Sequence, residues 1–206
     1  MFESLHSSGR EVGSSFAMYK DGKALIDIWG GYTDKQKTNP WSRNSLATVW
    51  STTKGVAALT CAIAVEKGLL DYEEKVSHYW PEFGCNGKED ITIGMLLSHQ
   101  AGICGSTTNN VHDYYNQQIM SEELAAMSPI WKPGTASGYH SMTHGWLTSE
   151  LIIRVTGKTL GTFYADEIGN PNDIDFFIGL PESEENRVVE MIPFPKEENR
   201  SQVSTE

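Results

Sequence analysis

A serine and a lysine stand three positions apart in the stretch Ser51-Thr52-Thr53-Lys54. Residues 52–67 contain four alanines and no proline, and Gly68 follows them, so the sequence predicts a helix that begins next to Ser51. On a helix, positions i and i+3 share a face, and a serine at the N-terminus lies near the positive end of the helix dipole. Ser51 and Lys54 are therefore a candidate nucleophile and base for attack on a carbonyl group.

The Ser-x-x-Lys pattern carries little weight by itself. With 19 serines and 11 lysines in the chain, about one such pair is expected by chance. The context is more informative, because an aromatic loop ending in Trp50 precedes the serine and a mainly apolar helix follows it. This context predicts that Lys54 points into a partly buried site.

A tyrosine is the second residue that could move a proton. Tyr139-His140-Ser141 follows a Pro-Gly turn and leads into a predicted helix. Near an ammonium group the pKa of a tyrosine falls, which makes the side chain a usable base. The alternative is a packed aromatic residue with its hydroxyl group satisfied at the surface.

Histidines and cysteines suggest other chemistry, but the patterns are weak. His140 and His144 have an i, i+4 spacing, yet no His-Glu-x-x-His, no cysteine pair at ligand spacing and no obvious third ligand accompany them, so we expect no metal and no other cofactor. His99 is expected to pack at a helix end. Cys61 lies inside an apolar run and is expected to be a small buried hydrophobic residue.

Composition and charge exclude several classes of partner. The net charge is −11 and no basic cluster is present, so nucleic acid and anionic membranes are not expected as partners. The longest nearly apolar run has ten residues, from Val56 to Val65, which is too short to span a bilayer. The first twelve residues lack the apolar region of a secretory signal. The lack of a signal and the three scattered cysteines together predict a cytoplasmic protein with reduced thiols. The oligomeric state is left open.

Few strands and several helices are expected along the chain. Asp21-Gly22 between two apolar runs predicts a β-hairpin over residues 16–29. Phe176-Phe177-Ile178 is interpreted as a short strand, and residues 182–206 as an acidic solvated tail. The remaining helices are expected at residues 91–98, 121–127, 143–155 and 159–168.

The order of these motifs resembles the serine β-lactamase and penicillin-binding-protein superfamily, and more closely its class C-like esterase branch. The similarity extends from about Gly9 to about Val189. The motifs that carry it are Asp27-x-Trp-Gly-Gly31, Val49-Trp-Ser-Thr-Thr-Lys-Gly55, Leu97-Ser-His-Gln-Ala-Gly102, Trp131-x-Pro-Gly-Thr135, Tyr139-x-Ser141 and Phe177-Ile-Gly-Leu-Pro181.

The resemblance implies an α+β fold of the β-lactamase/transpeptidase type and a role for each matched residue. Ser51 matches the acylated nucleophile, Lys54 the lysine that activates it, and Tyr139 the general base or proton shuttle. Ser141, Trp50 and Gln100 are expected to bind substrate. Because Ser141 stands where the β-lactamases proper carry asparagine, the implied substrate is a small-molecule carboxylic ester rather than a lactam or an amide.

The family's third motif, a Lys-Thr-Gly or His-x-Gly on a core strand, has no counterpart beyond Gly179. We therefore expect residues 1–181 to be the N-terminal part of a single β-lactamase-related domain. Two functions stay open on this basis. The chain is either a serine hydrolase that works through an acyl-enzyme on Ser51, or a truncated non-catalytic paralogue that binds a partner or is an incomplete gene product.

Overall fold

The computed structural model describes residues 1–193 of the chain. These residues fall into two compact units, one made of residues 1–49 together with the segment that begins at Leu180, and the other of residues Trp50–Gly179. Helices predominate, and the strands β1 and β2 form one two-stranded antiparallel sheet. This composition is the α+β composition predicted from the sequence.

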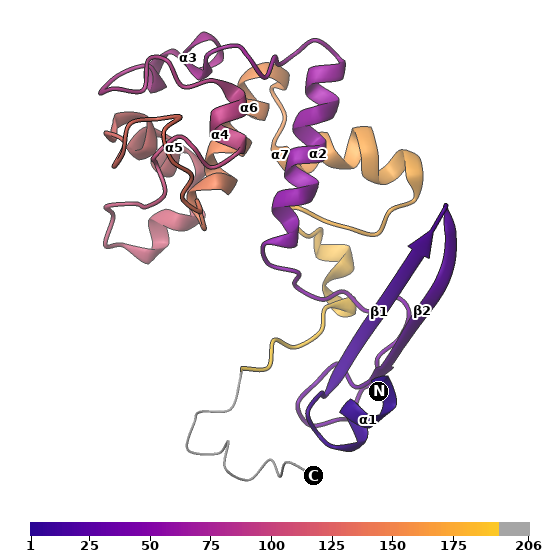
Figure 1. The fold of residues 1–206 in the computed structure, drawn as a ribbon. Coiled ribbons are helices and arrows are strands. Elements are labelled where there is room, and N and C mark those ends of the chain that lie inside the picture. Colours follow the sequence, from indigo (N-terminus) through magenta and orange to yellow (C-terminus); the bar gives the residue numbers. More distant parts are fainter. Residues whose placement is uncertain (194–206) are drawn as a thin grey trace. The chain divides into compact units, whose positions relative to one another are not determined.

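The first unit is built on the predicted β-hairpin. Strand β1 spans Gly13–Lys20 and β2 spans Lys23–Gly31, and the two residues between them, Asp21 and Gly22, have φ angles of 50° and 74°. Positive φ at both central residues is typical of a tight hairpin turn. The short helix α1, Phe2–Ser7, lies at the end of the hairpin away from this turn (Figure 1).

The residues after Leu180 complete the first unit. A 3₁₀ helix, η5, spans Glu182–Arg187, and the chain then runs beside Leu46, whose amide donates to the Arg187 carbonyl oxygen at 2.8 Å and whose carbonyl oxygen accepts from the Val189 amide at 2.9 Å. Part of the expected acidic tail therefore has a defined place in this unit. Residues 194–206 of that tail lie outside the described residues, and the division at residue 181 stays a prediction.

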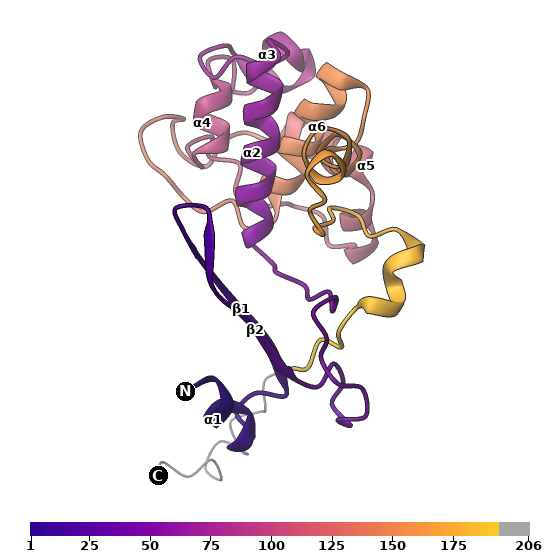
Figure 2. The same ribbon diagram turned by 90° about the vertical axis from the view of Figure 1, so that its right-hand side faces the viewer.

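The second unit is a group of helices around one apolar core. Helix α2 spans Thr52–Glu66, one residue shorter than predicted, and is followed by Lys67 at the C-cap and Gly68, which has a φ of 69°. Its buried face is made of small side chains, Ala57, Thr60, Cys61 and Ala64, which allow α6 to approach closely (Figure 2). The other elements of this unit are α3 Val76–Tyr79, η1 Pro81–Phe83, α4 Ile93–Leu97, η2 Val111–Tyr115, α5 Gln117–Ala126, α6 Thr143–Thr156, α7 Leu160–Tyr164, η3 Ala165–Gly169 and η4 Asn170–Asn172.

Two sequence expectations about this unit are wrong. Helix α5 begins at Gln117 instead of residue 121, because the Asn116 side chain caps it by accepting from the Ile119 amide at 3.1 Å. Residues 176–178 do not form a strand. They pack against α7 instead, where the Phe176 ring lies 5.7 Å from the Tyr164 ring, and the Ile178 carbonyl oxygen occupies the space where a side chain at Gly161 would begin.

No helix in the described part of the chain is long and apolar enough to cross a membrane. Cys61 is fully buried, and burial raises the pKa of its thiol to about 12. The expectation that Cys61 is a buried core residue is confirmed.

Candidate active site

Ser51 stands at the entrance to α2. The preceding residue, Trp50, has a φ of 47°, a conformation that is uncommon for a residue with a large side chain. The chain then turns into the helix, where the Thr53 amide donates to the Trp50 carbonyl oxygen at 3.1 Å and the Lys54 amide to the Ser51 carbonyl oxygen at 3.0 Å. The Ser51 side chain makes no capping bond to its own helix, so its oxygen is available for other contacts.

Lys54 follows one turn later and is half-buried. Its ammonium group donates to Ser51 Oγ at 3.3 Å and to the backbone carbonyl oxygen of Ser141 at 2.7 Å. We find no ion pair between Lys54 and a carboxylate within residues 1–193. The Ser141 carbonyl oxygen therefore fixes the direction of Nζ without neutralising its charge.

Tyr139 completes a three-residue group with Ser51 and Lys54. Its hydroxyl group donates to Ser51 Oγ at 2.6 Å, and Lys54 Nζ lies 4.9 Å from the centre of its ring. The hydrogen bond to Ser51, and then the nearby Lys54 ammonium, lower the pKa of the Tyr139 phenol below its usual value. Both effects favour the ionised form of the phenol, in which the oxygen can accept the serine proton.

The loop that carries Tyr139 is held by tight packing at Gly138. A side chain at this glycine would begin 2.4 Å from Cη2 of the Trp131 ring, so only glycine fits. The Trp131 ring is fixed in turn, because its Nε1 donates to the Ala136 carbonyl oxygen at 3.0 Å. The motif from Trp131 to Tyr139 thus forms one rigid turn with the tyrosine at its end.

Three histidines, His99, His140 and His144, pack together next to Tyr139. The sequence did not predict that they lie together. The His99 ring centre lies 5.2 Å from Tyr139, 5.4 Å from His140 and 5.0 Å from His144. Burial lowers the pKa of all three imidazoles, that of His144 to about 4. Near neutral pH these three histidine side chains beside Lys54 are therefore polar but uncharged.

Both nitrogens of His140 are already occupied. Its Nε2 accepts from the Ile103 amide at 3.1 Å, which leaves Nδ1 to donate to the Gly138 carbonyl oxygen at 2.7 Å. In the described part of the chain, no three His, Cys, Asp or Glu side chains are grouped so that they could hold a metal ion.

The other residues expected to bind substrate differ in their positions. Ser141 contributes through its backbone carbonyl oxygen, the partner of Lys54. Trp50 is 72% exposed next to Ser51. The Gln100 side chain turns to Ser98, with its Nε2 donating to Ser98 Oγ at 2.8 Å. For all three residues a role in substrate binding stays a prediction.

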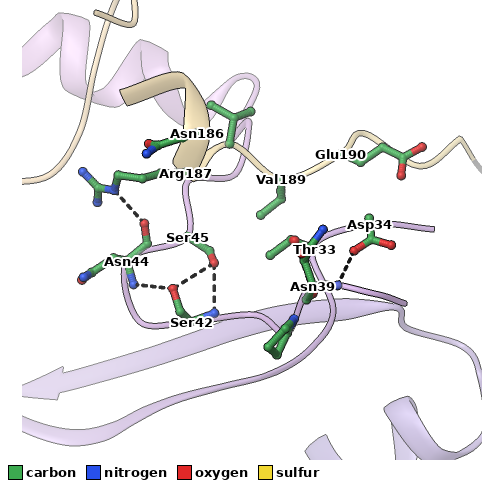
Figure 3. Close-up of a pocket in the computed structure, with 12 residues that line it drawn as sticks. Thr33, Asp34, Asn39, Ser42, Asn44, Ser45, Asn186, Arg187, Val189 and Glu190 are labelled. Carbon is green, nitrogen blue, oxygen red and sulfur yellow. Dashed lines mark hydrogen bonds between the residues drawn. The ribbon is translucent and has the colours of Figure 1, made fainter. Parts of the chain in front are cut away.

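A polar hollow in the first unit contains none of the predicted site residues. Figure 3 shows its wall, which comes from two segments, residues 33–45 and 186–190. Its polar groups bond to one another: Arg187 Nε donates to the Asn44 carbonyl oxygen at 2.9 Å, and the Asp34 carboxylate accepts from the Asn39 amide at 2.7 Å. We therefore regard the hollow as a packing feature of this unit.

The fold is of the β-lactamase/transpeptidase-like class, and it contains the Ser51–Lys54–Tyr139 group. Two solved structures share it with this chain: a family VIII carboxylesterase (42% identity, TM-score 0.87, covering 93% of this chain and 53% of that one) and a penicillin-binding protein homologue from Caulobacter crescentus (38% identity, TM-score 0.88, covering 93% and 52%).

Sequence comparison gives the family. The Beta-lactamase family model matches residues 1–204, and the chain therefore belongs to this family. It is 38% identical over 193 residues to the esterase/beta-lactamase LipL of Mycobacterium tuberculosis, covering 93% of this chain and 45% of that protein. The chain thus spans about half the length of the relatives it matches. The resemblance and the fold class predicted from the sequence are confirmed.

Proposed function

We propose that this chain carries the nucleophile and the proton-transfer groups of a serine hydrolase that cleaves a small-molecule carboxylic ester through an acyl-enzyme. The observation that carries the proposal is the position of Ser51 Oγ, which lies 2.6 Å from the Tyr139 hydroxyl oxygen and 3.3 Å from Lys54 Nζ. A nucleophile within hydrogen-bond reach of a base, with that base held by further contacts, is the arrangement on which nucleophilic catalysis depends.

The geometry supports a definite order of steps. Ser51 Oγ attacks the ester carbonyl carbon while its proton passes to the base formed by Tyr139 and Lys54. The same proton then goes to the leaving alcohol as the carbon–oxygen bond of the ester breaks, which leaves the acyl group on Ser51. Water, deprotonated by the same base, attacks the acyl carbon, releases the carboxylic acid and returns the proton to Ser51.

The amide at the entrance to α2 has a role in this scheme. The Ser51 N–H makes no backbone hydrogen bond within the described residues, and it lies at the positive end of the helix dipole. We assign it as one donor to the negative oxygen that develops on the attacked carbonyl group.

The substrate class rests on the relatives and on Ser141. A carboxylesterase and an esterase/beta-lactamase are among the similar proteins, and Ser141 offers no amide side chain to a lactam substituent. A lactam is the second candidate, because a penicillin-binding protein homologue is also 38% identical.

The test is a comparison of turnover. The chain and its Ser51→Ala variant are given p-nitrophenyl butyrate and, separately, a chromogenic cephalosporin. Hydrolysis of the ester that the variant lacks, with slower or no cleavage of the cephalosporin, supports the proposal. Faster cleavage of the cephalosporin overturns the choice of ester. Equal hydrolysis by the chain and the variant overturns the role of Ser51. Hydrolysis by neither favours a non-catalytic chain.

A further inference from the structure

His99 occupies a backbone position at which a glycine is usual. Helix α4 ends with the Gln100 amide donating to the Met95 carbonyl oxygen at 2.8 Å and the His99 amide to the Leu96 carbonyl oxygen at 3.2 Å. This pattern places a left-handed residue just after the helix, and that residue is most often glycine. His99 has a φ of 64° there, whereas α2 has Gly68 at the corresponding position with a φ of 69°.

A residue with a side chain costs conformational energy at this position, which glycine avoids. Backbone outliers of this kind concentrate at functional sites, where the surrounding structure maintains them. The contacts of the His99 side chain therefore indicate what the position is used for.

The contacts of His99 bracket Tyr139 on both sides. The His99 carbonyl oxygen accepts from the Gly138 amide at 3.0 Å, and His99 Nδ1 accepts from the His140 amide at 3.2 Å. The His99 ring also meets the Tyr139 ring edge-on at 5.2 Å. One residue outside the loop thus holds the backbone amide of Gly138, the backbone amide of His140 and the ring of Tyr139.

We propose that His99 is a positioning residue, which holds the Tyr139 side chain toward Ser51 by accepting the His140 amide on Nδ1. The role rests on the proposed function, because it serves the base of that reaction. It requires an unprotonated Nδ1, and the environment favours this state: burial, and then the charge of Lys54, lower the pKa of the imidazole.

His140 strengthens the same arrangement. Because its Nδ1 donates to the Gly138 carbonyl oxygen at 2.7 Å, the His140 side chain is bonded to the peptide group before Tyr139, while His99 holds the amides of Gly138 and His140. Loss of the His99 acceptor would release the His140 amide and loosen this link.

Two substitutions separate positioning from packing. His99→Gly removes the acceptor and the ring but suits the left-handed backbone, which offsets part of the lost contacts, and thermal melting checks that the variant stays folded. His99→Asn also tolerates that backbone, and its Oδ1 can take the place of Nδ1. The asparagine variant is therefore the rescue control.

The first readout does not depend on activity. The phenol of Tyr139 is titrated by NMR in the chain labelled with ¹³C-tyrosine, and Tyr139→Phe identifies the signal. We expect His99→Gly to raise the pKa of Tyr139 toward the usual tyrosine value, because the hydroxyl group loses its fixed contact with Ser51, and His99→Asn to keep it low.

The second readout is ester turnover, where His99→Gly should lower kcat by about 10²-fold with little change in KM, and His99→Asn should restore most of it. A His99→Gly variant with an unchanged Tyr139 titration overturns the proposal, as does a His99→Asn variant that behaves like His99→Gly. If the chain hydrolyses no ester but the titration responds as expected, the positioning role stands and the proposed function fails.

Discussion

The Tyr139 hydroxyl oxygen and Ser51 Oγ lie 2.6 Å apart although 88 positions of sequence separate them. The contact depends on two separate structures, the N-terminal entrance of α2 and the rigid turn that follows Trp131. Small errors in either structure would break a contact of this length, so the site should respond to substitutions that alter the backbone as well as to those that remove a reacting group.

Replacing the tyrosine hydroxyl group tests the base. We expect Tyr139→Phe to lower the rate of ester cleavage by about 10²- to 10⁴-fold. Tyr115→Phe, at a residue that is 86% exposed, is the control and should leave the rate unchanged. A Tyr139→Phe variant with the original rate would remove the phenol from the mechanism.

The pH dependence of kcat/KM tests the same group. The Ser51 hydroxyl and the Lys54 ammonium lower the pKa of Tyr139, so the ionised base is available above that lowered pKa and is lost as the pH falls through it. The rate should therefore rise with pH, with a midpoint below the usual tyrosine pKa, and Tyr139→Phe should abolish this rise. A midpoint at the usual tyrosine pKa would contradict the arrangement.

Lys54 is expected to act by exchanging a proton. Lys54→Arg should then be as damaging as Lys54→Ala, with a loss of about 10²- to 10⁴-fold in acylation rate, because arginine stays protonated. The matched control is Lys67→Arg just beyond the end of α2, where the lysine pairs with Glu167 at 2.8 Å on the surface. If Lys54→Arg kept most of the rate, Lys54 would be acting only as a positive charge.

Gly138 and Gly145 form a matched pair for the turn that carries Tyr139. A side chain at Gly138 would begin 2.4 Å from the Trp131 ring, whereas at Gly145 on α6 no atom lies within 4 Å. Gly138→Ala should destabilise the chain by about 1–3 kcal/mol and reduce turnover, and Gly145→Ala should be neutral or stabilising by up to about 1 kcal/mol. Chemical denaturation measures both, and equal stability of the two variants would mean that the turn can relax.

Lys88 is a buried lysine that the proposed mechanism does not use. Its side chain is fully buried, and its Nζ donates to the carbonyl oxygens of Cys85 and Met127. Lys88→Met would leave the Met127 oxygen without this donor, at a cost of about 1–3 kcal/mol, whereas the Cys85 oxygen would keep its bond from the backbone amide of residue 88 at 3.1 Å.

The control for Lys88→Met is Lys75→Met, which removes an exposed pair with Asp90 at 2.7 Å and should leave the free energy of unfolding nearly unchanged, because exposed ion pairs contribute little. Thermal and urea unfolding measure the change in the free energy of unfolding for both variants. A Lys88→Met variant as stable as Lys75→Met would show that the Met127 carbonyl oxygen finds another donor.

Local patterns were sufficient to predict the hairpin and α2. Asp21-Gly22 fixes a turn by local backbone preference, and the alanine-rich run after Ser51 leaves few alternatives to a helix. The start of α5 was misplaced because Asn116, and not Ser121, provides the cap. The apolar run at residues 176–178 looked like a strand, but its neighbour in the fold is a helix.

The helical spacing indicated that Ser51 and Lys54 lie together, whereas the proximity of Tyr139 was suggested by the resemblance to a family, since no local rule connects residues 51 and 139. His99 was interpreted as a helix-end residue, which it is. Its contact with the His140 amide comes from tertiary structure, and no pattern in one sequence indicates it. The burial of Lys88 was equally hidden, because a lysine in a polar stretch is normally exposed.

Covalent labelling of the chain tests the nucleophile most directly. The chain of residues 1–206 is incubated with a fluorophosphonate, its intact mass is measured, and the modified residue is located by peptide mapping. Ser51→Ala, whose free energy of unfolding should change by less than about 0.5 kcal/mol, and Ser183→Ala, on an exposed serine of η5, serve as the paired variants. We predict one adduct per chain, on Ser51, present in Ser183→Ala and absent from Ser51→Ala; an adduct on another serine with Ser51 unmodified, or an equal adduct in Ser51→Ala, would contradict the assignment of Ser51 as the nucleophile.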